Sequence, residues 1–138
     1  MAGTFPFKLI SPLGVSFGGE VEEATAQSPL GEFGVLPQHI NFITSLVPGI
    51  LRLKLSGGSF KHYIVDGGLA EVRDGVMTVL ATNTIEALGL DRTAISREVE
   101  VAEERLSQLS FYQAEYQAAE HQLMLARAKM AAAELSGA

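Results

Sequence analysis

The sequence predicts an α+β fold, in which an N-terminal antiparallel β-sandwich or flattened barrel is followed by an antiparallel hairpin of two α-helices. Three observations support this prediction. All five prolines lie between Pro6 and Pro48, and twelve of the fourteen glycines lie between Gly3 and Gly75. Within this region short apolar runs recur about every eight to ten residues, a spacing typical of all-β domains. After Gly89 the apolar residues change to helical spacing.

The two parts are expected to form separate domains, a β-sandwich domain over residues 1–85 and a helical hairpin domain over residues 86–138. Glycine and proline mark turns and disfavour helix interiors, so a region without them favours helix. No glycine or proline stands between Gly89 and Gly137. The boundary therefore falls close to Gly89.

The expected strands are short apolar or alternating runs that are separated by turn-forming residues. The clearest is Ile50–Leu55, whose leucines at every second position share one face while its two basic residues share the other. Gly57-Gly58 and Asp74-Gly75 stand where tight hairpins need residues of positive φ. The expected strands are Phe5–Ile10, Val15–Phe17, Val21–Ala26, Phe33–Leu36, Phe42–Leu46, Ile50–Leu55, Phe60–Val65, Leu69–Val72 and Val76–Ala81.

The region after Gly89 predicts two helices. Asp91 is the expected N-cap of the first, since its carboxylate can accept a backbone N–H, and Ser107 to Ser110 offers a break. At about 1.5 Å per residue the second helix spans roughly 35 Å, so part of it must lie on the first helix or on a partner. The apolar stripes are Ile95, Val99, Ala102, Leu106 and Leu109, then Tyr112, Tyr116, Ala119, Leu123, Ala126, Met130 and Ala133.

Composition excludes several classes of protein. The chain has 138 residues, no cysteine and a net charge of −6. We therefore expect no disulfides or thiolate metal sites, and neither nucleic acid nor an anionic membrane surface as a partner. No apolar run approaches the roughly 18 residues of a membrane span, and the N-terminus does not have the layout of a signal peptide. These observations predict a soluble protein of a reducing, cytoplasm-like compartment.

The residues do not predict a catalytic or metal site. His39, His62 and His121 do not have the spacing that metal sites use, and the serines do not stand in a Gly-x-Ser-x-Gly elbow. Gly67-Gly68 lies between two expected strands, which favours a bend or a close-packing site over a dinucleotide fingerprint. Taken alone, these patterns predict a β-sandwich with a helical hairpin and no active site.

Four blocks follow one another through the β region: Gly31–His39, Leu46–Leu51, Tyr63–Val72 and Val76–Ala81. In order and spacing, and together with the helical tail, they resemble the epsilon subunit of F-type ATP synthases. The resemblance covers nearly the whole chain. It implies a non-catalytic subunit of the central rotor, without a cofactor, that binds the gamma subunit and stands on the ring of c subunits. It also implies a peripheral position on the cytoplasmic face of the bacterial inner membrane, without membrane insertion.

The resemblance also assigns partner contacts. It places Glu32 and Phe33 against the polar loops of the c-ring and His39 against gamma. The alternative is that Phe33 belongs to the core and His39 to a hydrogen-bonded turn. Where the family usually has Gly-His-Ala-Pro, this chain has Gln38-His39-Ile40-Asn41, so the local loop geometry is expected to differ.

The helical tail carries a second implication. In many bacterial members the helices fold against the sandwich or extend along gamma toward the catalytic beta subunits, inhibiting ATP hydrolysis. Some bind ATP through a motif that reads Ile/Leu-Asp-x-x-Arg-Ala. Here Leu90 and Asp91 match, but Ala94 occupies the arginine position, and the basic positions of the second helix align with Leu125 and Lys129. An alanine cannot pair with a phosphate, so we expect little or no ATP binding.

Two other interpretations follow from the residues alone. The first is an unrelated adaptor, built from a β-sandwich with a helical protein-interaction tail. The second is an enzyme, for which the sequence offers no catalytic residues. Co-purification with gamma distinguishes the rotor subunit from the adaptor, and turnover by the isolated chain would be needed to support an enzyme.

Overall fold

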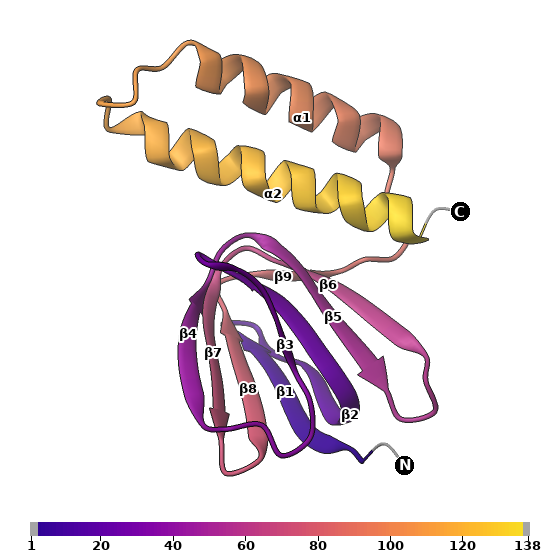
Figure 1. The fold of residues 1–138 in the computed structure, drawn as a ribbon. Helices are drawn as coiled ribbons and strands as arrows, with labels where there is room; N and C mark the ends of the chain where they lie inside the picture. The colour runs from indigo at the N-terminus through magenta and orange to yellow at the C-terminus, as the bar shows by residue number, and fades with distance from the viewer. Residues whose placement is uncertain (1–2, 137–138) are drawn as a thin grey trace.

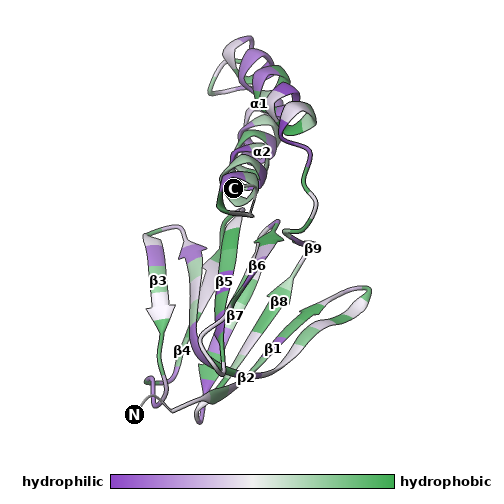
Figure 2. Ribbon diagram, turned by 90° about the vertical axis from the view of Figure 1, so that its right-hand side faces the viewer, coloured by the Kyte–Doolittle hydropathy of each residue, from purple (hydrophilic) through white to green (hydrophobic). Residues whose placement is uncertain are grey.

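The computed structural model describes residues 3–136. They form a β-sandwich and a hairpin of two helices that lies across one end of it, with the second helix between the first helix and the strands (Figure 1). Seen from the side, the hairpin stands on that end of the sandwich (Figure 2). The predicted fold class is confirmed.

Nine strands form the sheet, in the order β4-β7-β8-β1-β2-β5-β6-β9, and β3 pairs with β2. Two of the predicted strands are parts of the single strand β2, and β9 was not predicted. The strands are β1 Phe5–Ser11, β2 Gly14–Ser28, β3 Gly31–Val35, β4 Phe42–Leu46, β5 Gly49–Leu55, β6 Phe60–Val65, β7 Gly68–Arg73, β8 Val76–Ala81 and β9 Thr84–Glu86.

The long strand β2 joins the two layers of the sandwich. Its first half pairs with β1, and its second half pairs with β5 on one side and β3 on the other. The β2–β5 register shifts between Val21 and Glu23. Such bulges bend a strand and increase its twist, which lets one strand belong to both layers.

The strands β1 and β8 are parallel, with Phe7 opposite Met77 and Ile10 opposite Leu80. All other pairings among the described residues are antiparallel. The prediction of an antiparallel sandwich or flattened barrel did not include this parallel pair. Apolar alternation shows which residues form strands but does not show which strands become neighbours.

The core lies between the two layers. Strand β5 buries Leu51 and Leu53 completely while Arg52 is exposed, which confirms the alternation predicted for it. Phe17, Phe33, Phe42 and Leu55 pack against the edges of the core. The buried residues are Phe5, Phe7, Leu9, Val21, Ala24, Ala26, Val35, Leu46, Leu51, Leu53, Tyr63, Val65, Ala70, Val72, Met77, Val79 and Ala81.

Glycine is required at the tight connections. Asp74 and Gly75, which join β7 to β8, both have positive φ, 51° and 81°, as a two-residue hairpin turn needs. Gly68 begins β7 with φ of +140°, and a Cβ added there would lie 2.0 Å from the carbonyl oxygen of Leu80. The sequence favoured a bend or a close-packing site at Gly67-Gly68, and Gly68 is closely packed.

The helices are α1, Arg92–Ser107, and α2, Glu115–Ser136. Asp91 is the N-cap of α1, because its Oδ1 accepts hydrogen bonds from the backbone N–H groups of Thr93 and Ala94 at 3.0 and 3.2 Å. Helix α2 begins later than predicted: Phe111 and Tyr112 lie in the loop between the helices and are exposed. The ring of Tyr112 had extended the predicted apolar stripe without extending the helix.

Helix α2 is buried on two faces. Ala119, Leu123 and Ala126, from the predicted stripe, are buried in a helix that packs along α1. Ala128 and Ala132 form a second cluster with Ile64 and Ala87, onto which Ile50, Leu90 and Leu125 pack. The sequence stripe showed only the first face, since small alanines on the second face resemble ordinary helix-forming residues.

Candidate functional site

The β2–β3 turn projects from the end of the sandwich on which the hairpin lies. The Ser28 hydroxyl donates to the Gly31 carbonyl oxygen at 2.9 Å and accepts from the Leu30 N–H at 3.2 Å. Gly31 has φ of +120°. The side chain of Leu30, at the tip, is fully exposed. A turn held this firmly presents an apolar side chain that is available for a partner.

Glu32 follows the turn and is exposed. Its carboxylate accepts a hydrogen bond from the Gln27 side-chain amide at 3.0 Å. It also lines a groove between α2 and the sandwich, together with Arg127 and Leu135 of the helix. The carboxylate predicted to meet the c-ring therefore lies beside the last turns of the docked α2.

Phe33 and His39 both pack on Phe42. Phe33 is half-buried and packs edge-to-face on Phe42, with ring centroids 5.4 Å apart. The half-buried ring of His39 lies 5.1 Å from the same phenylalanine, and its Nδ1 is 2.7 Å from the carbonyl oxygen of Ile40. Both side chains thus contribute to packing, and each retains a partly exposed edge. Glu32, at a neighbouring position of β3, points to the opposite face from Phe33.

A surface that the sequence did not predict lies on the outer face of the layer formed by β4, β7, β8, β1 and the first half of β2. Ile10, Val15, Leu69 and Leu80 are direct cross-strand neighbours on β1, β2, β7 and β8, so their side chains share one face. We call these four residues the outer row. Val15, Leu69 and Leu80 are 61%, 39% and 49% exposed. Ile43 on β4 lies beside the row, two residues from Ser45, which pairs with Leu69.

The outer row has a recognisable signal in the sequence. A strand with one solvated face should carry polar residues on it, yet β8 carries Val79, Leu80 and Ala81 in succession. Two of these point into the core and Leu80 points out. Contiguous exposed apolar residues on a folded domain mark interaction surfaces. Successive apolar residues in a strand whose one face lies in the core therefore indicate that its outward face also contacts a partner.

The ATP-motif positions lie at the start of α1. The carboxylate of Asp91 serves as the helix cap, and Ala94 is exposed. Lys129 of α2 pairs with Glu98 of α1 at 3.1 Å. A groove of about 510 Å³ between the helices is lined by Ala102, Leu125 and Ala126, and also by the basic side chains of Arg97, Arg105 and Lys129. Of these, Arg105 donates to Gln122 at 2.7 Å.

One histidine of the sandwich has a shifted pKa. His62 on β6 lies opposite Arg52 on β5. Partial burial, and then the positive charge of Arg52, lower the pKa of His62 below its usual value of 6.5. Within residues 3–136, no group of three or more histidine and acidic side chains could hold a metal ion. Neither helix in the described part of the chain is long and apolar enough to cross a membrane.

Comparison with known proteins relates this architecture to one family. Residues 4–87 match the family model described as the β-sandwich domain of the ATP synthase delta/epsilon chain. The chain is 43% identical over 103 residues to the ATP synthase epsilon chain of Afipia carboxidovorans, covering 75% of each chain. It is 33% identical over 105 residues to that of Persephonella marina, covering 76% of this chain and 75% of the relative.

Solved structures share the fold. A chain of the Euglena gracilis mitochondrial ATP synthase, in an assembly of OSCP, F1 and c-ring, aligns with a TM-score of 0.83 at 24% identity, covering 94% of this chain and 81% of that one. A chain of the Tetrahymena thermophila central stalk and c-ring aligns with a TM-score of 0.58 at 15% identity, covering 92% and 94%. At these identities the similarity is one of fold.

Proposed function

Because this chain belongs to the ATP synthase delta/epsilon family, we propose that it is a non-catalytic subunit of the rotor, which binds the gamma subunit and stands on the c-ring. The observation that carries the gamma contact is the outer row, an apolar band across four strands of a rigid sheet. A sandwich with a dense core suits a part that transmits torque, since it deforms little. The subunit is expected to lie peripherally, on the cytoplasmic face of a bacterial inner membrane.

The outer row and the β2–β3 turn are expected to bind different partners. The outer row, with Ile43 beside it, offers apolar area to gamma, and His39, which packs on Phe42, is expected to add a contact. The β2–β3 turn offers Leu30 and Glu32 to the c-ring loops. Exposed apolar residues at the core of an interface supply most of its affinity, while a rim charge such as Glu32 mainly sets orientation and specificity.

The hairpin is proposed to regulate hydrolysis through the catalytic beta subunits. What supports this is the character of its contact with the sandwich, which is made largely by alanines of α2 against Ile64 and Ala87. Small side chains remove little apolar area from water, so this contact is weaker than one made by larger residues. A hairpin held in this way can leave the sandwich without unfolding it.

Co-expression with gamma tests the main proposal. Leu80→Asp places a charge in the middle of the outer row at a position that is already half exposed, so the fold should survive. We expect gamma captured on this variant to fall at least about ten-fold, because an unpaired charge would be desolvated in the interface. Val101→Asp, on an exposed face of α1, is the matched control and should capture gamma normally. Undiminished capture by both Leu80→Asp and Leu69→Asp would exclude the outer row.

A further inference from the structure

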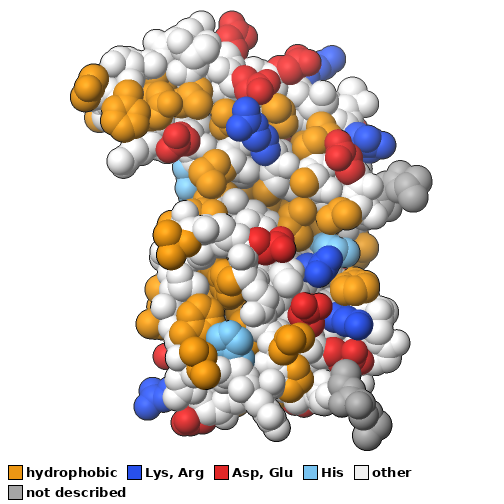
Figure 3. Space-filling view, viewed as in Figure 1, with side chains coloured by type: hydrophobic (Ala, Val, Ile, Leu, Met, Phe, Trp, Pro, Cys, Tyr) orange, Lys and Arg blue, Asp and Glu red, His pale blue; other side chains and the backbone are white. Residues whose placement is uncertain are grey.

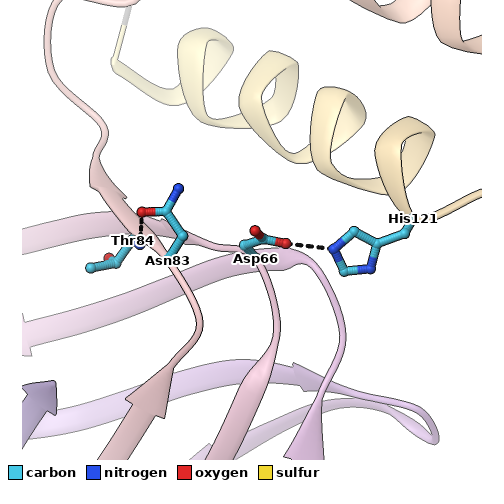
Figure 4. Close-up of polar contacts among 4 residues, drawn as sticks. All are labelled: Asp66, Asn83, Thr84 and His121. Carbon is cyan, nitrogen blue, oxygen red and sulfur yellow. Dashed lines mark hydrogen bonds and ion pairs between the residues drawn. The ribbon is translucent and has the colours of Figure 1, made fainter. Parts of the chain in front are cut away.

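One polar contact joins the sandwich to the hairpin away from the cluster of Ala128 and Ala132. Nε2 of His121, in the second turn of α2, lies 2.5 Å from Oδ1 of Asp66 in the β6–β7 turn (Figure 4). The side chains are 46% and 25% exposed. The two residues are 55 positions apart in the chain, so the contact exists only while the hairpin is docked.

The turn that presents Asp66 is held in place. The Asp66 N–H donates to the carbonyl oxygen of Asn83 at 3.1 Å, and the Thr82 N–H donates to that of Gly67 at 3.1 Å. A Cβ added to Gly67 would lie 3.8 Å from the His121 ring, which shows how closely the helix approaches the turn. Asp66 is thus fixed by its backbone before the helix arrives.

The pair lies at the end of the docking contact that is far from the linker. Ala128 and Ala132 contact Ile64 and Ala87 beside the linker that leads into α1. His121 precedes these alanines by 7 and 11 residues, or roughly 10 to 16 Å along the helix. Without the pair, the hairpin is fastened only near the linker and can pivot about it.

We propose that His121 and Asp66 form a latch that holds the hairpin docked on the sandwich. The imidazole and the carboxylate bond to each other only in the docked state, and in the released hairpin both side chains face water. Loss of either side chain removes the bond, so it should raise the fraction of released hairpin.

Polar groups farther along α2 have partners of their own. On α1, Glu98 and Glu103 pair with Lys129 and Arg127 at 3.1 and 3.2 Å, and Arg105 donates to Gln122 at 2.7 Å. Arg52 and His62 of the sandwich line the groove at Arg127, six residues beyond His121. These pairs lie within the hairpin, whereas the bond of His121 to Asp66 joins the hairpin to the sandwich.

The latch is a property of the isolated chain, and it rests on the proposed function only for its effect on the holoenzyme. The chain has no cysteine, so dyes can be attached at Ser56→Cys and Ala114→Cys, both exposed positions. Energy transfer between them reports docking, and amide hydrogen exchange in α2 reports opening even where the docked state dominates. Both are measured on the full chain at one pH, about 7.5.

His121→Ala and Asp66→Ala should each lower the ratio of docked to released hairpin about two- to five-fold, the range of a partly exposed polar pair. The double variant should resemble either single one, because the two side chains act on docking through each other. Glu103→Gln, which breaks a pair within the hairpin, should leave the ratio unchanged. An unchanged ratio in His121→Ala or in Asp66→Ala, or additive losses in the double variant, would overturn the latch. Gamma binding through the outer row would be unaffected by any of these outcomes.

Discussion

At the scale of single residues, His62 makes the stability of the sandwich depend on pH. Its pKa is lowered by burial and by the charge of Arg52, so the folded state favours the neutral ring. As pH falls below the ordinary value of about 6.5, the unfolded chain binds a proton that the folded chain resists, and stability is lost.

The chain should therefore be less stable to urea at pH 5.5 than at pH 7.5, and His62→Gln should reduce this difference. Because the side chain is partly solvated, the reduction is expected to be below about 1 kcal/mol. Urea midpoints at the two pH values measure it, with His39→Gln as the matched control. The prediction fails if His62→Gln retains the whole pH difference.

Replacement of Gly68 should destabilise the sandwich strongly, even when the new residue is as small as alanine. An added Cβ would collide with the Leu80 carbonyl at 2.0 Å, and φ is +140°. We expect Gly68→Ala to cost about 2–4 kcal/mol, by strain and displaced backbone. Gly57→Ala is the control, since its φ is +98° but nothing lies within 4 Å; it should cost about 1 kcal/mol. Equal urea midpoints for the two variants would contradict this account.

The motif at the start of α1 predicts weak nucleotide binding. Ala94 cannot pair with phosphate, and the carboxylate of Asp91 already caps the helix. Calorimetric titration of the chain with magnesium-ATP should show no site tighter than about millimolar, near −4 kcal/mol. Ala94→Arg should strengthen binding if the motif logic holds, whereas a micromolar site in the original chain would refute it.

At the scale of elements, the sequence predicted what local pattern determines. The strand β5 and the cap of α1 follow from alternation and from one carboxylate before a helix. The strand β9 was missed because Thr84–Glu86 is three residues long, too short for alternation to be recognised. The outer row was missed because it is built from four strands, and neighbouring strands cannot be identified from local pattern alone.

The surroundings of Glu32 and Phe33 were predicted only in part. The resemblance proposes both as partner contacts, but whether Phe33 lies at the surface or packs on the core depends on Phe42, which lies on another strand. The pairing of His121 with Asp66 likewise depends on how two distant elements meet. Such contacts are decided by tertiary packing, so the residues show candidates without their partners.

The sandwich is expected to fold without the hairpin. Truncation after Leu88 exposes Ile64 and Ile50, which pack in the cluster with α2, but leaves the core between the layers intact. We expect a cooperative unfolding transition with stability lowered by about 1–3 kcal/mol. Circular dichroism during urea titration measures it. A truncated chain without a cooperative transition would show that the two domains fold as one.

At the scale of the whole molecule, the two ends of the sandwich differ. One carries both the hairpin and the β2–β3 turn with Glu32, which line a shared groove. The loop joining the helices adds a surface of hydrophobic side chains, including Phe111 and Tyr112 (Figure 3). A partner bound at this end can therefore influence both the proposed c-ring contact and the hairpin.

Glu32→Arg should test the ring contact in the assembled complex. An exposed charge contributes little to stability, so the isolated fold should be unchanged while ATP-driven proton pumping falls. Glu20→Arg, on the exposed part of β2, is the control and should pump normally. Pumping by the Glu32 variant at the level of the control would reject Glu32 as a ring contact.

The parallel pairing of β1 with β8 also has a consequence for biosynthesis. Phe7 and Met77 are opposite each other, so the ribosome must add about 70 residues after the first before the second exists, on the order of 4 to 14 s at bacterial elongation rates. During that interval β1 can pair with β2, but its other edge remains open. Such an edge, next to buried aromatic residues, is a site at which nascent chains aggregate. The emerging sandwich is therefore expected to need chaperone protection until β8 closes it.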